Sequence, residues 1–223
     1  MPEPGLQAVL WDMDGVIADT GIYHCRAWQD VFRERGAGFT DAYFMRRFGQ
    51  RNDTIIRSAL GQAVTMEEIR IIAAEKEANY RRRIDGKLRA LPGAVELLKA
   101  LKENGIMSAV ASSAPPENIS FILETLGIAR GFQATVYGYE VSEGKPSPQI
   151  YRLAAKKLGV APANCVVLED AVAGVQGAKR GGMKCVAVTT SHPRESLGEA
   201  DLVVDTLAEV SVAVLAGLFA ANK

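Results

Sequence analysis

Residues 8–20 read AVLWDMDGVIADT, and this stretch decides the fold. Its first four residues are apolar, which is typical of a strand buried on both faces of a sheet. Two carboxylates follow, Asp12 and Asp14, with Gly15 directly behind them. On extended backbone the side chains at i and i+2 point to the same side, so both carboxylates are expected to face one small volume. The carboxyl ends of parallel strands are where open α/β sheets build their sites.

Two carboxylates this close repel each other unless a proton or a cation lies between them. Oxygen ligands suit Mg²⁺, which takes one or two protein carboxylates and completes its shell with water and substrate phosphate. The pair therefore indicates a Mg²⁺ site at the end of the first strand. The alternative is a solvated Asp-x-Asp-Gly turn, and the pair by itself does not decide between the two.

From residue 91 onward the chain alternates between short apolar runs and amphipathic segments that end at glycine. Strands are expected at 107–111, 134–137, 165–168, 184–188 and 202–204. Helices are expected from 92 to Gly105, at 116–126, at 148–158 and up to residue 179. Strands and helices that alternate at these lengths predict an α/β protein with a doubly wound parallel sheet.

Residues 19–90 carry helical patterns and no β-like alternation. Helices are expected at 20–35, 40–48 and 52–60, and a fourth begins at Thr65 with capping-box spacing to Glu68. The three arginines at 81–83 read as a solvated face of that helix. We therefore expect a small all-helical cap, residues 19–90, inserted into a catalytic core formed by residues 1–18 and 91–223.

Composition gives no support for some classes of partner. The 223 residues include 26 basic and 26 acidic side chains, so net charge gives no case for nucleic acid or an anionic membrane. The three cysteines are read as reduced, buried thiols. No apolar leader precedes residue 8, and we expect a cytoplasmic protein with no obligate protein partner. The apolar tail at 207–221 is short for a membrane span and carries Glu209, which favours a terminal helix packed on the core.

Four short motifs together resemble the haloacid dehalogenase superfamily, whose members are mostly phosphatases and phosphomutases. DMDGVIADT at 12–20 resembles the first motif of that family. Ser112 after the strand at 107–111 resembles the second, and Lys145 in GKPSP resembles the third. The pair Glu169 and Asp170 after the strand at 165–168 resembles the fourth. The resemblance extends from residue 8 to about residue 193.

This resemblance implies a role for each motif residue. Asp12 would be the nucleophile that forms an aspartyl-phosphate, and Asp14 the general acid and base. Lys145 would neutralise the phosphoryl group and the nucleophile. Ser112 would hold phosphate oxygens, although spacing alone favours a cap or turn serine and leaves Ser113 as an alternative.

The same resemblance implies a Mg²⁺ site. Asp12, Asp170 and the Met13 carbonyl are expected as direct ligands, with Glu169 as a direct or water-mediated neighbour. Three carboxylates at one sheet edge repel one another, and a bound cation would remove that cost.

Residues 19–90 resemble the small helical cap of the β-phosphoglucomutase-like branch, including IYHCRAW at 22–28. Hinges are expected near 18–21 and 88–92. Three cap residues, His24, Arg51 and Lys76, are candidates for contact with substrate. His24 is also expected to form a hydrogen bond near Asp14. Each has an ordinary alternative, a half-buried histidine or a solvated cation.

One departure from that branch bears on the reaction. Its mutases carry a Ser-Lys-Asn-like run after the second motif, which grips a second phosphate, whereas residues 114–116 here are Ala-Pro-Pro. This difference favours a phosphatase that acts on a small phosphorylated metabolite such as a sugar phosphate. A β-phosphoglucomutase-like mutase is the alternative if Arg51 or Lys76 supplies the anchor. A phosphate-binding protein without turnover is a third reading, disfavoured because Asp12, Asp14 and Lys145 are all present.

Overall fold

A computed structural model describes residues 5–220 of the chain, and its centre is a six-stranded sheet with the order β3-β2-β1-β4-β5-β6. Every neighbouring pair of strands is parallel. The strands are β1 (Ala8–Trp11), β2 (Met107–Ser112), β3 (Ala134–Tyr137), β4 (Cys165–Glu169), β5 (Lys184–Val188) and β6 (Leu202–Val204). The predicted α/β fold with a doubly wound parallel sheet is confirmed.

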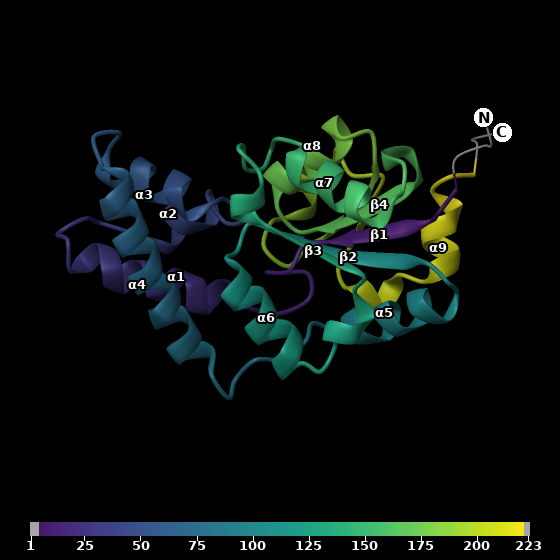
Figure 1. Cartoon of the computed structure of the whole chain (residues 1–223), viewed down its shortest axis with the longest axis horizontal. Coiled ribbons are helices and arrows are strands. Elements are labelled where there is room, and N and C mark those ends of the chain that lie inside the picture. The colour runs from purple at the N-terminus through teal and green to yellow at the C-terminus, as the bar shows by residue number, and fades with distance from the viewer. Residues whose placement is uncertain (1–4, 221–223) are drawn as a thin grey trace.

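Helices cover both faces of the sheet (Figure 1). One face packs against α5 (Ala94–Glu103), α6 (Pro116–Thr125) and α9 (Val212–Gly217). The other packs against α7 (Gln149–Leu158) and α8 (Val172–Arg180). Side chains alternate along each strand, so β1 sends Val9 and Trp11 to the first face and Ala8 and Leu10 to the second. An apolar run without polar positions is what a strand buried on both faces requires.

Four helices lie between β1 and α5 in the chain and at one end of the sheet (Figure 1, left). They are α1 (Gly21–Arg33), α2 (Asp41–Met45), α3 (Asn52–Leu60) and α4 (Met66–Ile84). These helices share an apolar cluster of their own, built around Trp28 and Phe32. The chain leaves and returns through neighbouring segments, since Ala18 pairs with Ala90 and the Leu91 N–H donates to the Ile17 carbonyl at 2.9 Å.

The C-terminal segment, expected to form a helix packed on the core, does place Leu215 of α9 in the core but is helical over only part of 207–220. It forms a short 3₁₀ turn, η5 (Leu207–Glu209), and then α9, and residue 221 lies outside the described residues. Thr206 caps the first turn and Ser211 caps the second, so two polar caps divide the apolar segment. Among residues 5–220, no helix has both the length and the apolar character that a membrane crossing requires.

Candidate active site

The candidate site lies where β1, β2 and β4 end. Asp12 follows β1, Ser112 is the last residue of β2, and Glu169 is the last residue of β4, with Asp170 next in the chain. The strand order places β2 and β4 on the two sides of β1, which makes this edge the point where the direction of winding reverses. A cavity of about 40 Å³ lies here, and its lining includes Asp12 and Ser112.

Lys145 pairs with two carboxylates. Its Nζ atom lies 2.6 Å from Asp12 Oδ1 and also contacts Glu169 Oε1. The three side chains are almost completely buried. Burial lowers the pKa of Lys145, but the two adjacent carboxylates raise it by more, so the ammonium group stays charged.

Glu169 is held as an anion by four donors. Besides Lys145, Oε1 accepts the Tyr151 hydroxyl at 2.6 Å, and Oε2 accepts the Asp170 and Ala171 N–H groups, each at 2.9 Å. Burial raises the pKa of Glu169, but Lys145 and these hydrogen bonds lower it by more. Both oxygens therefore accept hydrogen bonds from protein donors. This arrangement suits a role for Glu169 in positioning Lys145 better than a role as a direct metal ligand.

Asp12, Glu169 and Asp170 can each place one oxygen within 4.8 Å of the others. Burial raises the pKa of Asp12 to about 7, although Lys145 acts to lower it. Burial also raises the pKa of Asp170, and the neighbouring carboxylates of Glu169 and Asp12 raise it further. Ser191 donates to Asp170 Oδ2, whereas Oδ1 is buried and has no hydrogen-bond partner within the described part of the chain. An unpaired buried carboxylate oxygen beside a second anion fits a divalent cation.

Met13 does not fit the expected ligand set. Its carbonyl oxygen accepts the N–H groups of Ile17 at 2.9 Å and Ala18 at 3.2 Å. The oxygen thus closes the turn after β1, and we leave Met13 out of the ligands. The family resemblance suggested this carbonyl as a ligand, but N–H groups of the turn that follows it donate to its oxygen instead.

Gly15 offers a test of the acidic cluster. It has φ +82°, and a Cβ atom built on it would lie 1.8 Å from Asp170 Oδ2. Gly15→Ala is expected to displace Asp170 and to weaken Mg²⁺ binding at the acidic cluster, measured by titration calorimetry, by at least about 10-fold. Gly127→Ala is the matched control, because φ is +68° there and no atom lies within 4 Å of the added carbon. The control should lose only about 1 kcal/mol of stability. Equal losses of Mg²⁺ affinity in the two variants would contradict this interpretation.

Asp14 faces the same cavity and binds two donors. Its Oδ1 accepts the Thr20 hydroxyl at 2.6 Å and lies 3.2 Å from His24 Nε2, as expected for a histidine near Asp14. Burial raises the pKa of Asp14, but His24 and Thr20 lower it by more, so the net shift is downward. The His24 ring stacks on Tyr80 with centroids 3.8 Å apart, which fixes the plane of the imidazole. Thr20 was expected only to begin a helix.

Lys76 is buried, which excludes its reading as a solvated cation. Its Nζ lies 2.7 Å from His24 Nδ1 and 2.9 Å from Glu77 Oε1. Glu77 in turn accepts the side-chain amides of Asn52 at 2.7 Å and Asn118 at 2.6 Å. The sequence did not identify Glu77, Asn52 or Asn118 as site residues. The apolar pattern of a helix does not indicate which polar residue has a partner elsewhere in the chain.

Arg81 is not part of a solvated face, so that expectation is wrong for this residue. Its Nη1 donates to Asn118 Oδ1 at 2.8 Å. Arg82 and Arg83 are exposed, as expected.

Arg51 forms contacts that a sequence does not reveal. Its Nη2 and Nε atoms bind Asp53 at 2.9 and 3.2 Å, and Nη1 donates to the Val141 carbonyl at 2.9 Å. The guanidinium group therefore has a carboxylate partner and a carbonyl partner from the loop that precedes Lys145.

The two candidate serines are distinguished by their partners. Ser113 donates to the Gly49 carbonyl at 2.8 Å, so its hydroxyl joins the four-helix unit to the loop after β2. Ser112 Oγ accepts the Ala114 N–H at 3.1 Å and retains its own proton for another acceptor. Both line the cavity, and only Ser112 has a hydroxyl donor that is not already used.

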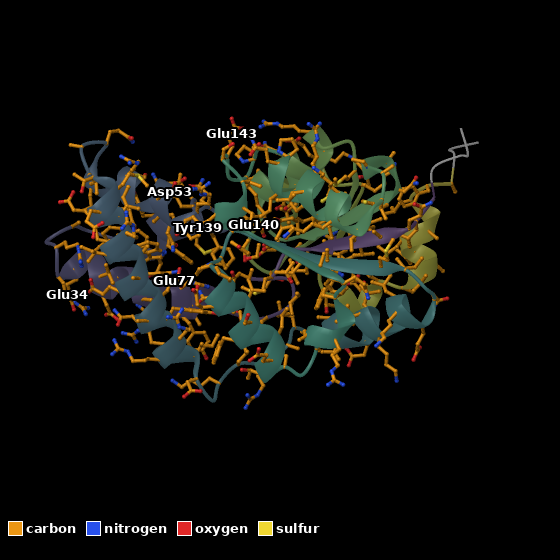
Figure 2. All side chains as sticks on the ribbon, viewed as in Figure 1. Glu34, Asp53, Glu77, Tyr139, Glu140 and Glu143 are labelled. Carbon is orange, nitrogen blue, oxygen red and sulfur yellow. The ribbon has the colours of Figure 1, made fainter. Side chains whose placement is uncertain are left out.

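A second, larger cavity of about 590 Å³ adjoins the first. Asn52 and Glu77 line both cavities. Figure 2 labels Glu77, Asp53 and Tyr139 in the zone where the four helices meet the rest of the chain, and all three line this second cavity.

Comparisons with known proteins agree with this arrangement. The chain is 31% identical over 210 residues to validoxylamine A 7'-phosphate phosphatase of Streptomyces hygroscopicus subsp. limoneus, covering 92% of this chain and 95% of the relative. It is 34% identical to β-phosphoglucomutase of Bacillus subtilis over 222 residues, covering 94% of each. The crystal structure of β-phosphoglucomutase from Clostridium difficile superposes with a TM-score of 0.88 at 29% identity, covering 96% of this chain and 97% of the other. The family model for haloacid dehalogenase-like hydrolases matches residues 6–182, and the chain belongs to that family.

Proposed function

We propose that this protein is a Mg²⁺-dependent phosphatase that hydrolyses a small phosphorylated metabolite, such as a sugar phosphate, through an aspartyl-phosphate on Asp12. The observation that carries the proposal is the buried Asp12 carboxylate, 2.6 Å from Lys145 Nζ, in a cavity that also holds Asp14 and Ser112. A nucleophile, an acid–base group and hydrogen-bond donors for phosphoryl oxygens are what phosphoryl transfer requires.

The residues divide the reaction between them. Asp12 attacks phosphorus, while Lys145 favours the ionised form of the nucleophile and offsets charge on the transferred group. A phosphate dianion in the cavity raises the pKa of Asp14, because like charges disfavour the carboxylate, and the protonated Asp14 can then donate to the leaving oxygen. Asp14 afterwards accepts a proton from the water that hydrolyses the aspartyl-phosphate. Ser112 donates to a phosphoryl oxygen.

The proposed metal ligands are Asp12 and Asp170, with Glu169 close by as the anion that positions Lys145. A Mg²⁺ ion bound there would supply positive charge to the phosphoryl oxygens. The unpaired Asp170 Oδ1 supports this assignment.

The volumes of the two cavities suggest where the two parts of the substrate bind. The cavity of about 40 Å³ has room for about three waters, which is comparable to a phosphoryl group. The leaving group then requires the cavity of about 590 Å³, whose charged and amide lining suits a hydroxylated molecule. We keep residues 19–90 as the cap and 1–18 with 91–223 as the core, with hinges near 18–21 and 88–92 that admit water between turnovers.

Hydrolysis is favoured over the mutase alternative because Arg51 and Lys76, the two cations considered as anchors for a second phosphate, each have a carboxylate partner. Pro115 caps α6 and Pro116 begins it, so two N–H groups are missing from the start of that helix. Arg51 is paired with Asp53, and Lys76 with Glu77. A distal dianion is usually held by charged donors, and these two are already neutralised.

Free phosphate is therefore the expected main product from sugar monophosphates, with little glucose 6-phosphate formed from β-glucose 1-phosphate. A screen of phosphorylated metabolites for phosphate release, with the isomerisation assayed in parallel, measures both. Introducing Ser, Lys and Asn at 114–116 is expected to raise any isomerase activity. Isomerisation much faster than phosphate release in the unmodified protein would establish the mutase instead. Absence of any turnover would favour the binding protein.

Removal of divalent cations by EDTA is expected to abolish activity, and Mg²⁺ to restore it, because Asp12, Glu169 and Asp170 crowd one buried volume. Mg²⁺ should also raise the melting temperature, since it binds the folded state. Full activity in EDTA would contradict the metal assignment. A cytoplasmic location, and the lack of nucleic-acid, membrane and obligate protein partners, stay predictions.

A further inference from the structure

A buried hydrogen-bonded chain runs from Asp14 to the start of α6. Asp14 contacts His24 at 3.2 Å, His24 contacts Lys76 at 2.7 Å, and Lys76 contacts Glu77 at 2.9 Å. Glu77 Oε2 then accepts the side-chain amide of Asn118 at 2.6 Å. Beyond Asp14, each of these side chains is buried. The chain thus runs from Asp14, after β1, through α1 and α4 of the four-helix unit to Asn118 on α6, so both of its ends lie outside that unit.

The geometry points to Glu77 as a positioning residue: through Lys76 and His24 it holds Asp14 in its reactive orientation only while α4 is seated against α6. This inference rests on the proposed phosphatase function. His24 lies on α1, whereas Lys76 and Glu77 lie on α4. Asn118 lies on α6, which packs on the sheet. Separation of α4 from α6 would break the Glu77–Asn118 bond and leave a buried acceptor unpaired.

The orientation of Asn118 is fixed by a second donor. Arg81 Nη1 donates to Asn118 Oδ1 at 2.8 Å. A guanidinium group has no acceptor, so the amide oxygen must face Arg81 and the amide nitrogen must face Glu77. α4 therefore contacts Asn118 twice, once as a donor and once as an acceptor.

The chain contains two carboxylates, Asp14 and Glu77, with His24 and the Lys76 ammonium between them, which makes its members interdependent. Burial raises the pKa of Glu77, but Lys76 and His24 lower it by more, so Glu77 is ionised. Its carboxylate faces Lys76 and His24, the amides of Asn52 and Asn118 and, beyond Asn118, Arg81. At low dielectric, removing one member leaves its neighbours without compensation. A loss at Asn118 is thus expected to reach Asp14.

A comparison of two aryl phosphate substrates distinguishes a role in positioning Asp14 from a merely structural role. Phenyl phosphate and p-nitrophenyl phosphate are close in shape, but phenolate is the poorer leaving group and needs the proton from Asp14 more. The second-order constant kcat/KM reports formation of the aspartyl-phosphate. In the Mg²⁺-loaded enzyme, Asn118→Ala is expected to lower kcat/KM for phenyl phosphate at least about 10-fold more than for p-nitrophenyl phosphate.

Companion variants define the outcome. Arg81→Met, which keeps Asn118, should shift the ratio of the two constants in the same direction, and Asn104→Ala, an exposed asparagine, should leave it unchanged. In an Asp14→Asn background, Asn118→Ala should add no further change in the ratio. Equal losses for both esters in Asn118→Ala and Arg81→Met, or no loss in either, would overturn the inference. Failure of the wild-type protein to hydrolyse either ester would instead count against the proposed function.

Discussion

Asp12→Asn is expected to reduce turnover by about 10⁴-fold or more, because an amide is a poor nucleophile and no aspartyl-phosphate can form. The variant should still fold. Burial raises the pKa of Asp12 to about 7 in the metal-free protein, so the ionised carboxylate destabilises the folded state above the unfolded value near 4. Asparagine removes that cost at pH 7.5.

Measurement requires two assays on the same preparation. Phosphate release with Mg²⁺ tests catalysis, and thermal melting in EDTA tests the fold, where the variant should melt at or above the wild-type temperature. Turnover close to wild type would exclude the aspartyl-phosphate. A melting temperature that falls sharply would show that Asp12 is needed for folding as well, contrary to the direction of its pKa shift.

Lys145→Met is expected to reduce both activity and stability. The substitution leaves Asp12 and Glu169 buried without their shared counter-charge, which costs about 3–5 kcal/mol when one partner of a buried pair is removed. Activity should fall by about 10³-fold or more, because the charge that stabilises the transferred phosphoryl group is lost. Urea unfolding in EDTA measures the first effect, and kcat/KM with Mg²⁺ measures the second.

Lys156→Met is the matched control, since Lys156 is an exposed residue on α7, in the segment that follows Lys145. It should change stability by less than about 0.5 kcal/mol and leave activity unchanged. If Lys145→Met lost no more stability than this control, the ion pairs with Asp12 and Glu169 would not hold the site together.

Local sequence was enough for the elements of the sheet. The six expected strands appear at almost the same residues, because an apolar run of three to six residues bounded by glycine and polar loops has few other structures available. The helix in the C-terminal segment is shorter than the apolar tail. There the capping preference of Thr206 and Ser211 outweighed the apolar composition of the neighbouring residues.

Motif residues at strand ends were predictable for a similar reason. Strand order is the only tertiary fact needed to bring Asp12, Ser112 and Asp170 together, since parallel strands share one carboxyl edge. The Met13 carbonyl could not be placed in this way. Its orientation depends on a turn of a few residues, and the N–H groups of Ile17 and Ala18 in that turn donate to the carbonyl oxygen.

The sequence by itself determined the fold class, the inserted helices and the set of acidic and basic groups at the sheet edge, because each depends on periodicity or on position relative to a strand. Tertiary structure alone decided which charged groups are neutralised. Arg51 and Lys76 look equally free in the sequence, yet one is paired with Asp53 and the other with Glu77. Glu77, Asn118 and Arg81 acquire a common role only when α4 packs against α6. Such pairings join residues that are distant in the chain, and they form because burial makes an unpaired polar group costly.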